Sequence, residues 1–337
     1  MVIKNMGPLI FASLLLVPRQ IATANDSVVE LAVGGVTFTQ SQDVSMEEEV
    51  LTITPETVTV LYRFLNQTQA PVTLTVGFPL PELDLSQQDV LYAIPGSDPV
   101  NFVDFKTKVD GKAIKFDVVQ KAHLDAKDVT AAIRGSGLPI LLFGGDAQTR
   151  IAALTPEIRD RLISGGLLIP AGSNEKGEQI FGPAWSVVTY FTRKQVFPAG
   201  QAVTVEHRYK TSLGASQDTI LRKALRNSDG MAEMLDSYRK DYCLPEDFFG
   251  GLDKLAGGDP ANSAGLQERR IDYVLKTGAN WAGPIKSFRL IVDKGRGDRL
   301  VSFCFDNVKK ISSTAFEARM ENFVPTQDLK ILLIGKY

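Results

Sequence analysis

The segments TVTVLYRFL (residues 57–65) and VTLTVGF (residues 72–78) carry the clearest strand patterns in the chain. Both are rich in β-branched and aromatic residues, and such composition is typical of strands that bury one face. The intervening residues, NQTQAP (66–71), have the composition of a turn. The two segments therefore predict a β-hairpin, and they place the N-terminal part of the chain in a β fold.

Similar patterns lie on both sides of this pair. The dipeptide Asp110-Gly111 separates two further strand-like segments and is a strong hairpin signal. Helix signals are fewer: Thr155-Pro156-Glu157 has the composition of a helix start, and residues 250–265 have the composition of an exposed glycine-rich loop. Further strands are predicted at residues 36–39, 102–109, 113–119, 185–197, 202–210, 271–276, 285–292, 300–305, 315–323 and 328–334, and further helices at 125–134 and 228–240.

Short strands at this spacing predict a mainly β protein with two β-sandwich-like domains and helical insertions. The length of 337 residues is also consistent with two domains. The expected divisions are a signal peptide at 1–24, an N-terminal β-sandwich domain at 25–212 with a helical insertion at about 122–184, a helical and loop connection at 213–268, and a C-terminal β domain at 269–337.

The first 24 residues have the order of a secretory signal peptide. Lys4 supplies a positive charge, residues 8–17 (PLIFASLLLV) form an apolar run too short to span a bilayer, and Ala22-Thr23-Ala24 is a small-x-small cleavage signal. A retained anchor helix is the alternative. We expect cleavage after Ala24, a periplasmic or secreted protein, and no transmembrane segment after cleavage, because no later run reaches 18 apolar residues.

Charge excludes some classes of partner. The 37 basic and 39 acidic residues give a net charge of −2, with no basic patch of the kind that binds nucleic acid or an anionic membrane. The acidic run at residues 47–49 (EEE) has no calcium-loop spacing, and a solvated face explains it.

Two cysteines follow the predicted signal peptide, Cys243 and Cys304. An exported compartment oxidises thiols, so the pair is interpreted first as a disulfide. Two separate buried thiols are the alternative, because Cys304 lies in an apolar run.

Two further residues are candidates for a site. His207 shares a strand face with Val203, Val205 and Tyr209, which favours a hydrogen-bonded core histidine over a catalytic one. Trp281, in the turn TGANWAGP (277–284), either plugs the end of a sandwich or anchors a partner. The patterns assign no catalytic residue, no cofactor-binding residue and no metal ligand.

Several of these motifs resemble a family of exported bacterial proteins, domain of unknown function 4424. They are LAVGGV (31–36), FPLP (78–81), VDGK (109–112), FPAG (197–200), VEHRY (205–209), DYC (241–243) and the block from Tyr273 to Cys304. More distantly, YRFLN (62–66), FPLP (78–81), DGKAI (110–114) and FPAGQ (197–201) resemble the vault/inter-α-trypsin domain. The first resemblance implies no activity, and the second implies a β-sandwich used for interaction.

Two hypotheses for function follow. The first is a periplasmic binding, interaction or structural β module, with another envelope protein or a glycan as its partner, and without enzymatic activity. The second is a periplasmic hydrolase with a Ser/His/acid site, in which His207 would open to a cleft beside a serine or a carboxylate.

Overall fold

The structure, a computed structural model, describes residues 25–32, 35–87, 91–257 and 266–336, and its largest element is an eight-stranded central sheet. Neighbouring strands are antiparallel except for one parallel pair, between residues 287–292 and 48–53. One sheet therefore contains strands from both of the β-rich ends of the sequence. Its order is β20 (Lys309–Lys310), β21 (Ala315–Phe323), β18 (Ile285–Asp293), β3 (Val44–Ile53), β4 (Thr57–Asn66), β15 (Ala202–Lys210), β8 (Lys106–Val109) and β9 (Lys112–Ala113).

Two other sheets accompany the central sheet. The N-terminal sheet has the order β11 (Lys127–Asp128), β10 (Asp117–Leu124), β14 (Ser186–Phe197), β5 (Val72–Pro79), β1 (Ser27–Ala32) and β2 (Gly35–Thr39), with β6 (Leu83–Asp84) beside β14. The C-terminal sheet has the order β19 (Leu300–Phe303), β22 (Leu329–Lys336), β17 (Leu266–Tyr273), β16 (Leu213–Ser216) and β7 (Leu91–Ala93). A separate hairpin pairs β12 (Leu168–Ser173) with β13 (Gln179–Pro183).

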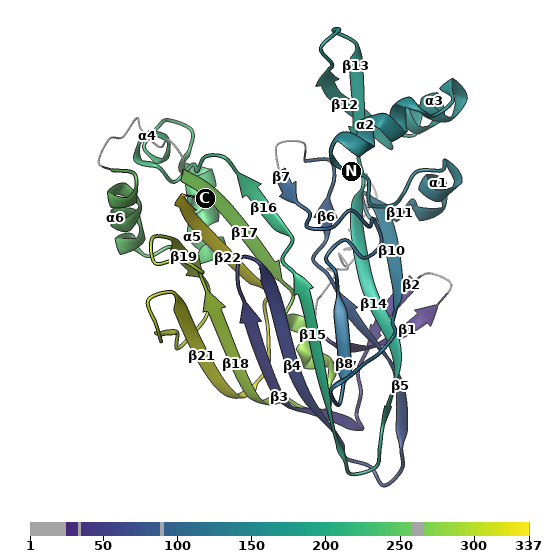
Figure 1. Ribbon diagram of the computed structural model, residues 1–337, viewed down its shortest axis with the longest axis vertical. Helices are drawn as coiled ribbons and strands as arrows, with labels where there is room; N and C mark the ends of the chain where they lie inside the picture. The colour runs from purple at the N-terminus through teal and green to yellow at the C-terminus, as the bar shows by residue number, and fades with distance from the viewer. Residues whose placement is uncertain (1–24, 33–34, 88–90, 258–265, 337) are drawn as a thin grey trace, which may run out of the picture.

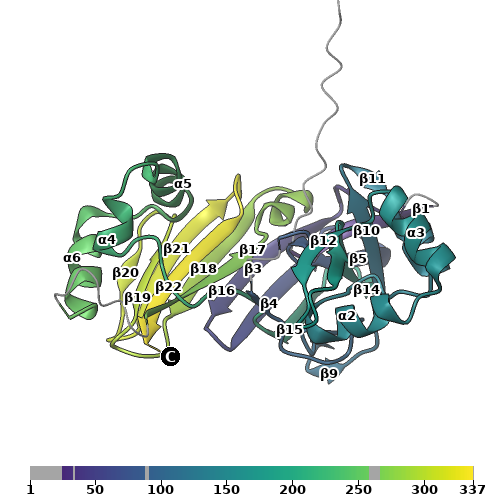
Figure 2. The ribbon, with the colours of Figure 1, turned by 90° about the horizontal axis from the view of Figure 1, so that it is seen from above.

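The helices form two groups at opposite sides of the molecule (Figures 1 and 2). The first group contains α1 (Thr130–Gly135), α2 (Gly144–Ala152) and α3 (Pro156–Ser164), near β10 and β14. The second contains α4 (Lys223–Arg226), α5 (Ala232–Tyr242) and α6 (Glu246–Leu255), near β19 and β22, and a 3₁₀ helix, η1 (Lys276–Asn280), follows β17. None of the described helices has the length and apolar character that a membrane span requires.

The mainly β fold predicted from the sequence is confirmed, and alternating burial builds its core. Along β4 the buried side chains are Val58, Val60, Tyr62 and Phe64, and the residues between them are exposed or half-buried. The same alternation in β15 buries His207 with its apolar neighbours, as the sequence predicted. This period of two leaves one face of each strand to pack against the facing sheet.

The predicted hairpin of residues 57–65 and 72–78 is wrong. Strand β4 pairs with β3 and β15 in the central sheet, whereas β5 pairs with β1 and β14 in the N-terminal sheet. The chain therefore crosses from one sheet to the other at residues 67–71. Asn66 holds this corner, because its side-chain amide donates to the carbonyl oxygens of Ala70 at 2.8 Å and Phe197 at 2.9 Å.

The structure contains the predicted disulfide between Cys243 and Cys304, with Cα atoms 5.0 Å apart. Cys243 follows α5 with a left-handed backbone (φ 48°), and Cys304 follows β19 directly. The bond therefore attaches the helical segment to the C-terminal sheet. A separate apolar cluster lies beneath the same helices, in which Phe248, Phe249 and Leu252 contact residues of β22.

Candidate functional site

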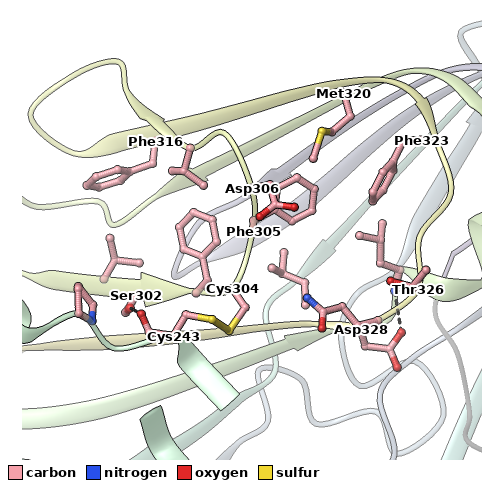
Figure 3. Close-up of a pocket in the computed structure, with 17 residues that line it drawn as sticks. Cys243, Ser302, Cys304, Phe305, Asp306, Phe316, Met320, Phe323, Thr326 and Asp328 are labelled. Atoms are coloured by element: carbon pink, nitrogen blue, oxygen red, sulfur yellow. Dashed lines mark hydrogen bonds between the residues drawn. A yellow bond between two sulfur atoms is a disulfide. The ribbon is translucent and has the colours of Figure 1, made fainter. Parts of the chain in front are cut away.

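A pocket of about 500 Å³ lies beside the disulfide (Figure 3). Its walls come from β21 of the central sheet, from β19 and the residues that follow it, and from the segment that leads into β22. Because β19 is the edge strand of the C-terminal sheet and β21 lies next to the edge strand β20 of the central sheet, the pocket lies between the edges of these two sheets.

Aromatic side chains form most of the pocket wall. Phe305 and Phe323 have ring centroids 5.7 Å apart, and both contact the buried ring of Phe288 behind them. Phe316 and Met320 extend the apolar surface along β21 (Figure 3). Rings held from behind by a buried side chain form a largely preformed apolar surface, which is the usual character of a small-molecule site.

Two polar side chains of the pocket, Ser302 and Asp328, already have partners within the protein. The Ser302 hydroxyl donates to the carbonyl oxygen of Tyr242 at 2.8 Å. The Asp328 carboxylate accepts from the backbone amides of Leu275 and Lys276 and lies 3.3 Å from the ammonium group of Lys276. Asp306 is the other charged side chain of the pocket, and among the described residues none forms a hydrogen bond or ion pair with its exposed carboxylate.

A second polar cluster is sealed inside the protein. Asp26 has no exposed surface, and its carboxylate lies 2.9 Å from the guanidinium of Arg193 and 2.9 Å from Nε2 of His207. Burial alone would raise the pKa of Asp26, but the charges and contacts of Arg193 and His207 outweigh it and lower that pKa to about 2. Burial lowers the pKa of His207 despite the neighbouring carboxylate, so the imidazole is neutral at pH 7.

Burial of His207 decides what its ring can do. The side chain is 0% exposed, and the rings of Tyr62, Phe78 and Phe105 surround it at centroid distances of 5.7, 5.0 and 5.0 Å. A substrate has no access to this ring, so the open cleft expected of a hydrolase is not found at His207. The contact with Asp26 was not predicted from the sequence.

Trp281 also lies in the interior. Its indole Nε1 donates to the carbonyl oxygen of Asp26 at 2.7 Å, and its ring lies 4.4 Å from Phe64, centroid to centroid. The side chain is 0% exposed and therefore presents no surface to a partner in this structure. The turn that contains it closes over the first described residues of the chain.

Glu49 corrects the interpretation of the acidic run at 47–49. The pattern suggested a solvated face, but the Glu49 side chain is fully buried on β3. Its Oε2 accepts from the amide of Asn25 at 3.0 Å, and its Oε1 has no hydrogen-bond partner among the described residues. Burial raises the pKa of Glu49 to about 8; the bond from Asn25 opposes the shift and the charge of Asp26 adds to it.

Sequence patterns could not identify this internal cluster. Its members come from β3, β14 and β15 and from the segment before β1, so no local spacing connects them. The one available signal was the alternation in β3, which places Glu49 on the face of the buried Leu51 and Ile53.

We expect Gly278→Ala to destabilise this cluster. A β-carbon at position 278 would lie 2.6 Å from Nδ2 of Asn25 and 3.0 Å from Cδ1 of Ile285, both below normal contact distance. The resulting overpacking should lower the free energy of unfolding by about 1–3 kcal/mol, measured by urea titration. The control is Gly297→Ala, where no atom lies within 4 Å of the added carbon. Equal midpoints for the two variants would contradict the prediction.

Comparison with known proteins identifies a family and distant structural neighbours. The family model for Domain of unknown function (DUF4424) matches residues 24–332. A protein from Legionella pneumophila with the provisional description "nutrient binding protein" is 14% identical, with a TM-score of 0.44 over 93% of this chain and 72% of the other. An M1 zinc metallopeptidase from Deinococcus radiodurans is 9% identical, with a TM-score of 0.23 over 88% of this chain and 43% of the peptidase. The search of curated proteins found no match.

Proposed function

We propose that this chain, which belongs to the DUF4424 family, is an exported binding protein whose C-terminal pocket holds a small amphipathic amine. One observation carries the proposal: a pocket of about 500 Å³ is walled by phenylalanines and a methionine and contains the carboxylate of Asp306. An apolar pocket with few polar groups is the common form of a small-molecule site. A carboxylate without an internal partner favours a cationic group on the ligand.

The signal-like segment and the disulfide support export. Residues 1–24 carry the order of a cleavable signal peptide, although they lie outside the described residues. Disulfides such as Cys243–Cys304 persist in oxidising compartments, and the periplasm is one of them. The proposed location is therefore the periplasm or the outside of the cell, after cleavage at Ala24.

The test measures ligand binding by calorimetry and by thermal shift. The panel contains phenylalkyl and indolyl amines, the corresponding alcohols, and soluble glycans. We expect the amines to bind and to raise the melting temperature, and the alcohols to bind about three- to tenfold more weakly because they lack the charge that Asp306 attracts. Preferential binding of glycans, or equal affinity for amines and alcohols, would contradict the proposed ligand class.

Two variants test whether the ligands bind in this pocket. Asp306→Asn should remove the preference for amines over alcohols, and Phe316→Ala should weaken both classes. Phe316 lies outside the main core cluster, so the fold should tolerate its replacement. Asp117→Asn, an exposed carboxylate on β10, is the matched control and should leave binding unchanged.

A further inference from the structure

The first described residues of the chain lie inside the protein. Asn25, Asp26 and Ser27 each have no exposed surface. Tyr62 donates its hydroxyl hydrogen to Oδ1 of Asn25, and Thr277 donates to the backbone carbonyl of Asn25 at 2.9 Å. Bonds from β4 and η1 thus hold the residue that follows the predicted cleavage site, which is unusual for a segment near the start of a mature chain.

Two buried carboxyl groups lie near Asn25, and only one of them has a cationic partner. Asp26 has the guanidinium of Arg193 as its counter-ion, at 2.9 Å. Glu49 has only the neutral amide of Asn25 on one oxygen, and no cationic side chain of the described residues forms an ion pair with it. Two phenols also face this carboxyl, Tyr62 and Tyr273, and neither supplies a positive charge. A buried carboxyl in such a setting remains protonated unless a cation comes near it.

We propose that cleavage after Ala24 creates this cation: the α-ammonium group of Asn25 forms a buried ion pair with Glu49, so that the mature N-terminus is part of the core. The inference rests on the export proposed above. In the 337-residue chain the nitrogen of Asn25 is a peptide nitrogen. This backbone nitrogen lies within ~5 Å of the side-chain Nδ2 of Asn25 by covalent geometry. The side-chain Nδ2 donates to Oε2 of Glu49 at 3.0 Å, so the new ammonium group would form close to the Glu49 carboxyl.

The chemical step balances with water alone. Water adds across the peptide bond between Ala24 and Asn25: the new carboxylate leaves with residues 1–24, and the new amine on Asn25 keeps the second proton of the water as an ammonium group. Glu49, which is ionised before it is buried, then enters the core as the carboxylate partner of that ammonium. Together with Asp26 and Arg193 the buried group then has no net charge. Because Asn25 is enclosed, the cleavage must come before folding is complete.

The experiment compares two starting points of the same protein. One protein begins at Asn25 with a free amine, and the other retains Ala24 as its first residue. We expect the protein that begins at Asn25 to melt about 5 °C higher, because its Glu49 gains a charged partner, whereas in the other protein a neutral Glu49 is buried with Oε1 unpaired. Glu49→Gln should lower the melting temperature of the first protein and leave the second almost unchanged at pH 6, where its Glu49 is already neutral. Glu48→Gln, an exposed neighbour, is the matched control for both.

The pH dependence gives a second measurement. In the protein that retains Ala24, burial raises the pKa of Glu49 from 4.5 to about 8. Its unfolded state then releases the proton first, so stability is greatest below about pH 4.5 and decreases as the pH rises toward 8. The protein that begins at Asn25 should lack this decrease, because the ammonium lowers the pKa of Glu49.

The proposed cleavage site and the proposed ion pair are tested by different measurements. Intact mass of the protein exported with its own leader reports where cleavage occurs, and a start other than Asn25 would overturn both the proposed cleavage site and the ion pair. A start at Asn25, combined with equal melting temperatures of the two proteins or an equal effect of Glu49→Gln in both, would overturn the ion pair alone.

Discussion

Replacing Arg193 by methionine should lower the free energy of unfolding by about 3–5 kcal/mol. Arg193 is 6% exposed on β14, and its guanidinium lies 2.9 Å from the buried carboxylate of Asp26. Methionine fills much of the same volume but has no charge, so the variant retains a buried carboxylate without its cation. Loss of one partner from a buried ion pair is among the most destabilising single changes known.

Urea titration with matched variants tests the cause of this loss. Arg319→Met removes an exposed ion pair with Glu317, at 2.9 Å, and should leave the unfolding midpoint unchanged. Adding Asp26→Asn to Arg193→Met should recover part of the loss, because the stranded charge is then absent. If the double variant is as unstable as the sum of its two parts, the ion pair is not the cause.

Acid unfolding provides a further check on the same pair. The pKa of Asp26 is lowered from 3.8 to about 2, so its contribution is complete above about pH 4 and is lost as the pH falls through 2. The Arg193→Met variant should lose much less stability over that interval, because the pKa of its Asp26 is no longer lowered by the guanidinium.

Removal of the disulfide should have a comparable effect on stability. Cys243 and Cys304 are separated by 61 positions, and a loop of that length corresponds to about 4 kcal/mol in the chain-entropy account. We expect the Cys243→Ser, Cys304→Ser double variant to unfold at a lower urea concentration by that amount. The unmodified protein in dithiothreitol should show the same shift, and reductant should have no effect on the double variant. A midpoint unchanged by either treatment would contradict the prediction.

The disulfide also contributes to the proposed binding site. Both cysteines line the pocket, and the bond holds the end of α5 against the residues that follow β19. Reduction should therefore weaken ligand binding as well as lower stability. Calorimetry of the oxidised and reduced protein, at a temperature where both are folded, separates the two effects.

Local sequence patterns predicted the structure correctly where it depends on residues a few positions apart. The alternation in β15 predicted that His207 enters the core with Val203, Val205 and Tyr209. The chemistry of Asp110-Gly111 predicted the hairpin between β8 and β9, where both residues have positive φ. The helix start at Thr155 is also present, because its hydroxyl oxygen accepts from the amide of Ile158 at the beginning of α3.

Two local predictions were wrong for an identifiable reason. The glycine-rich segment that begins at Gly250 was expected to be a loop, but α6 extends to Leu255 because Phe248, Phe249 and Leu252 bury their side chains against the C-terminal sheet. Residues 258–265 of that expected loop lie outside the described residues. The connection between β4 and β5 has the composition of a hairpin turn, yet it joins two sheets. Glycine and turn-forming residues permit several backbone conformations. Packing against residues distant in the sequence decides which of these conformations forms.

The amino-acid sequence alone therefore determined the β class, the cysteine pair and the buried face of the strand that carries His207. The β class and that buried face depend on side chains a few positions apart. Only the tertiary structure decided which strands share a sheet, and only it brought Asn25, Glu49 and Arg193 into one sealed cluster. It also brought β19 and β21 together around the pocket. The difference is physical: alternation is encoded by neighbours, but the partner of a buried charge depends on how distant segments pack.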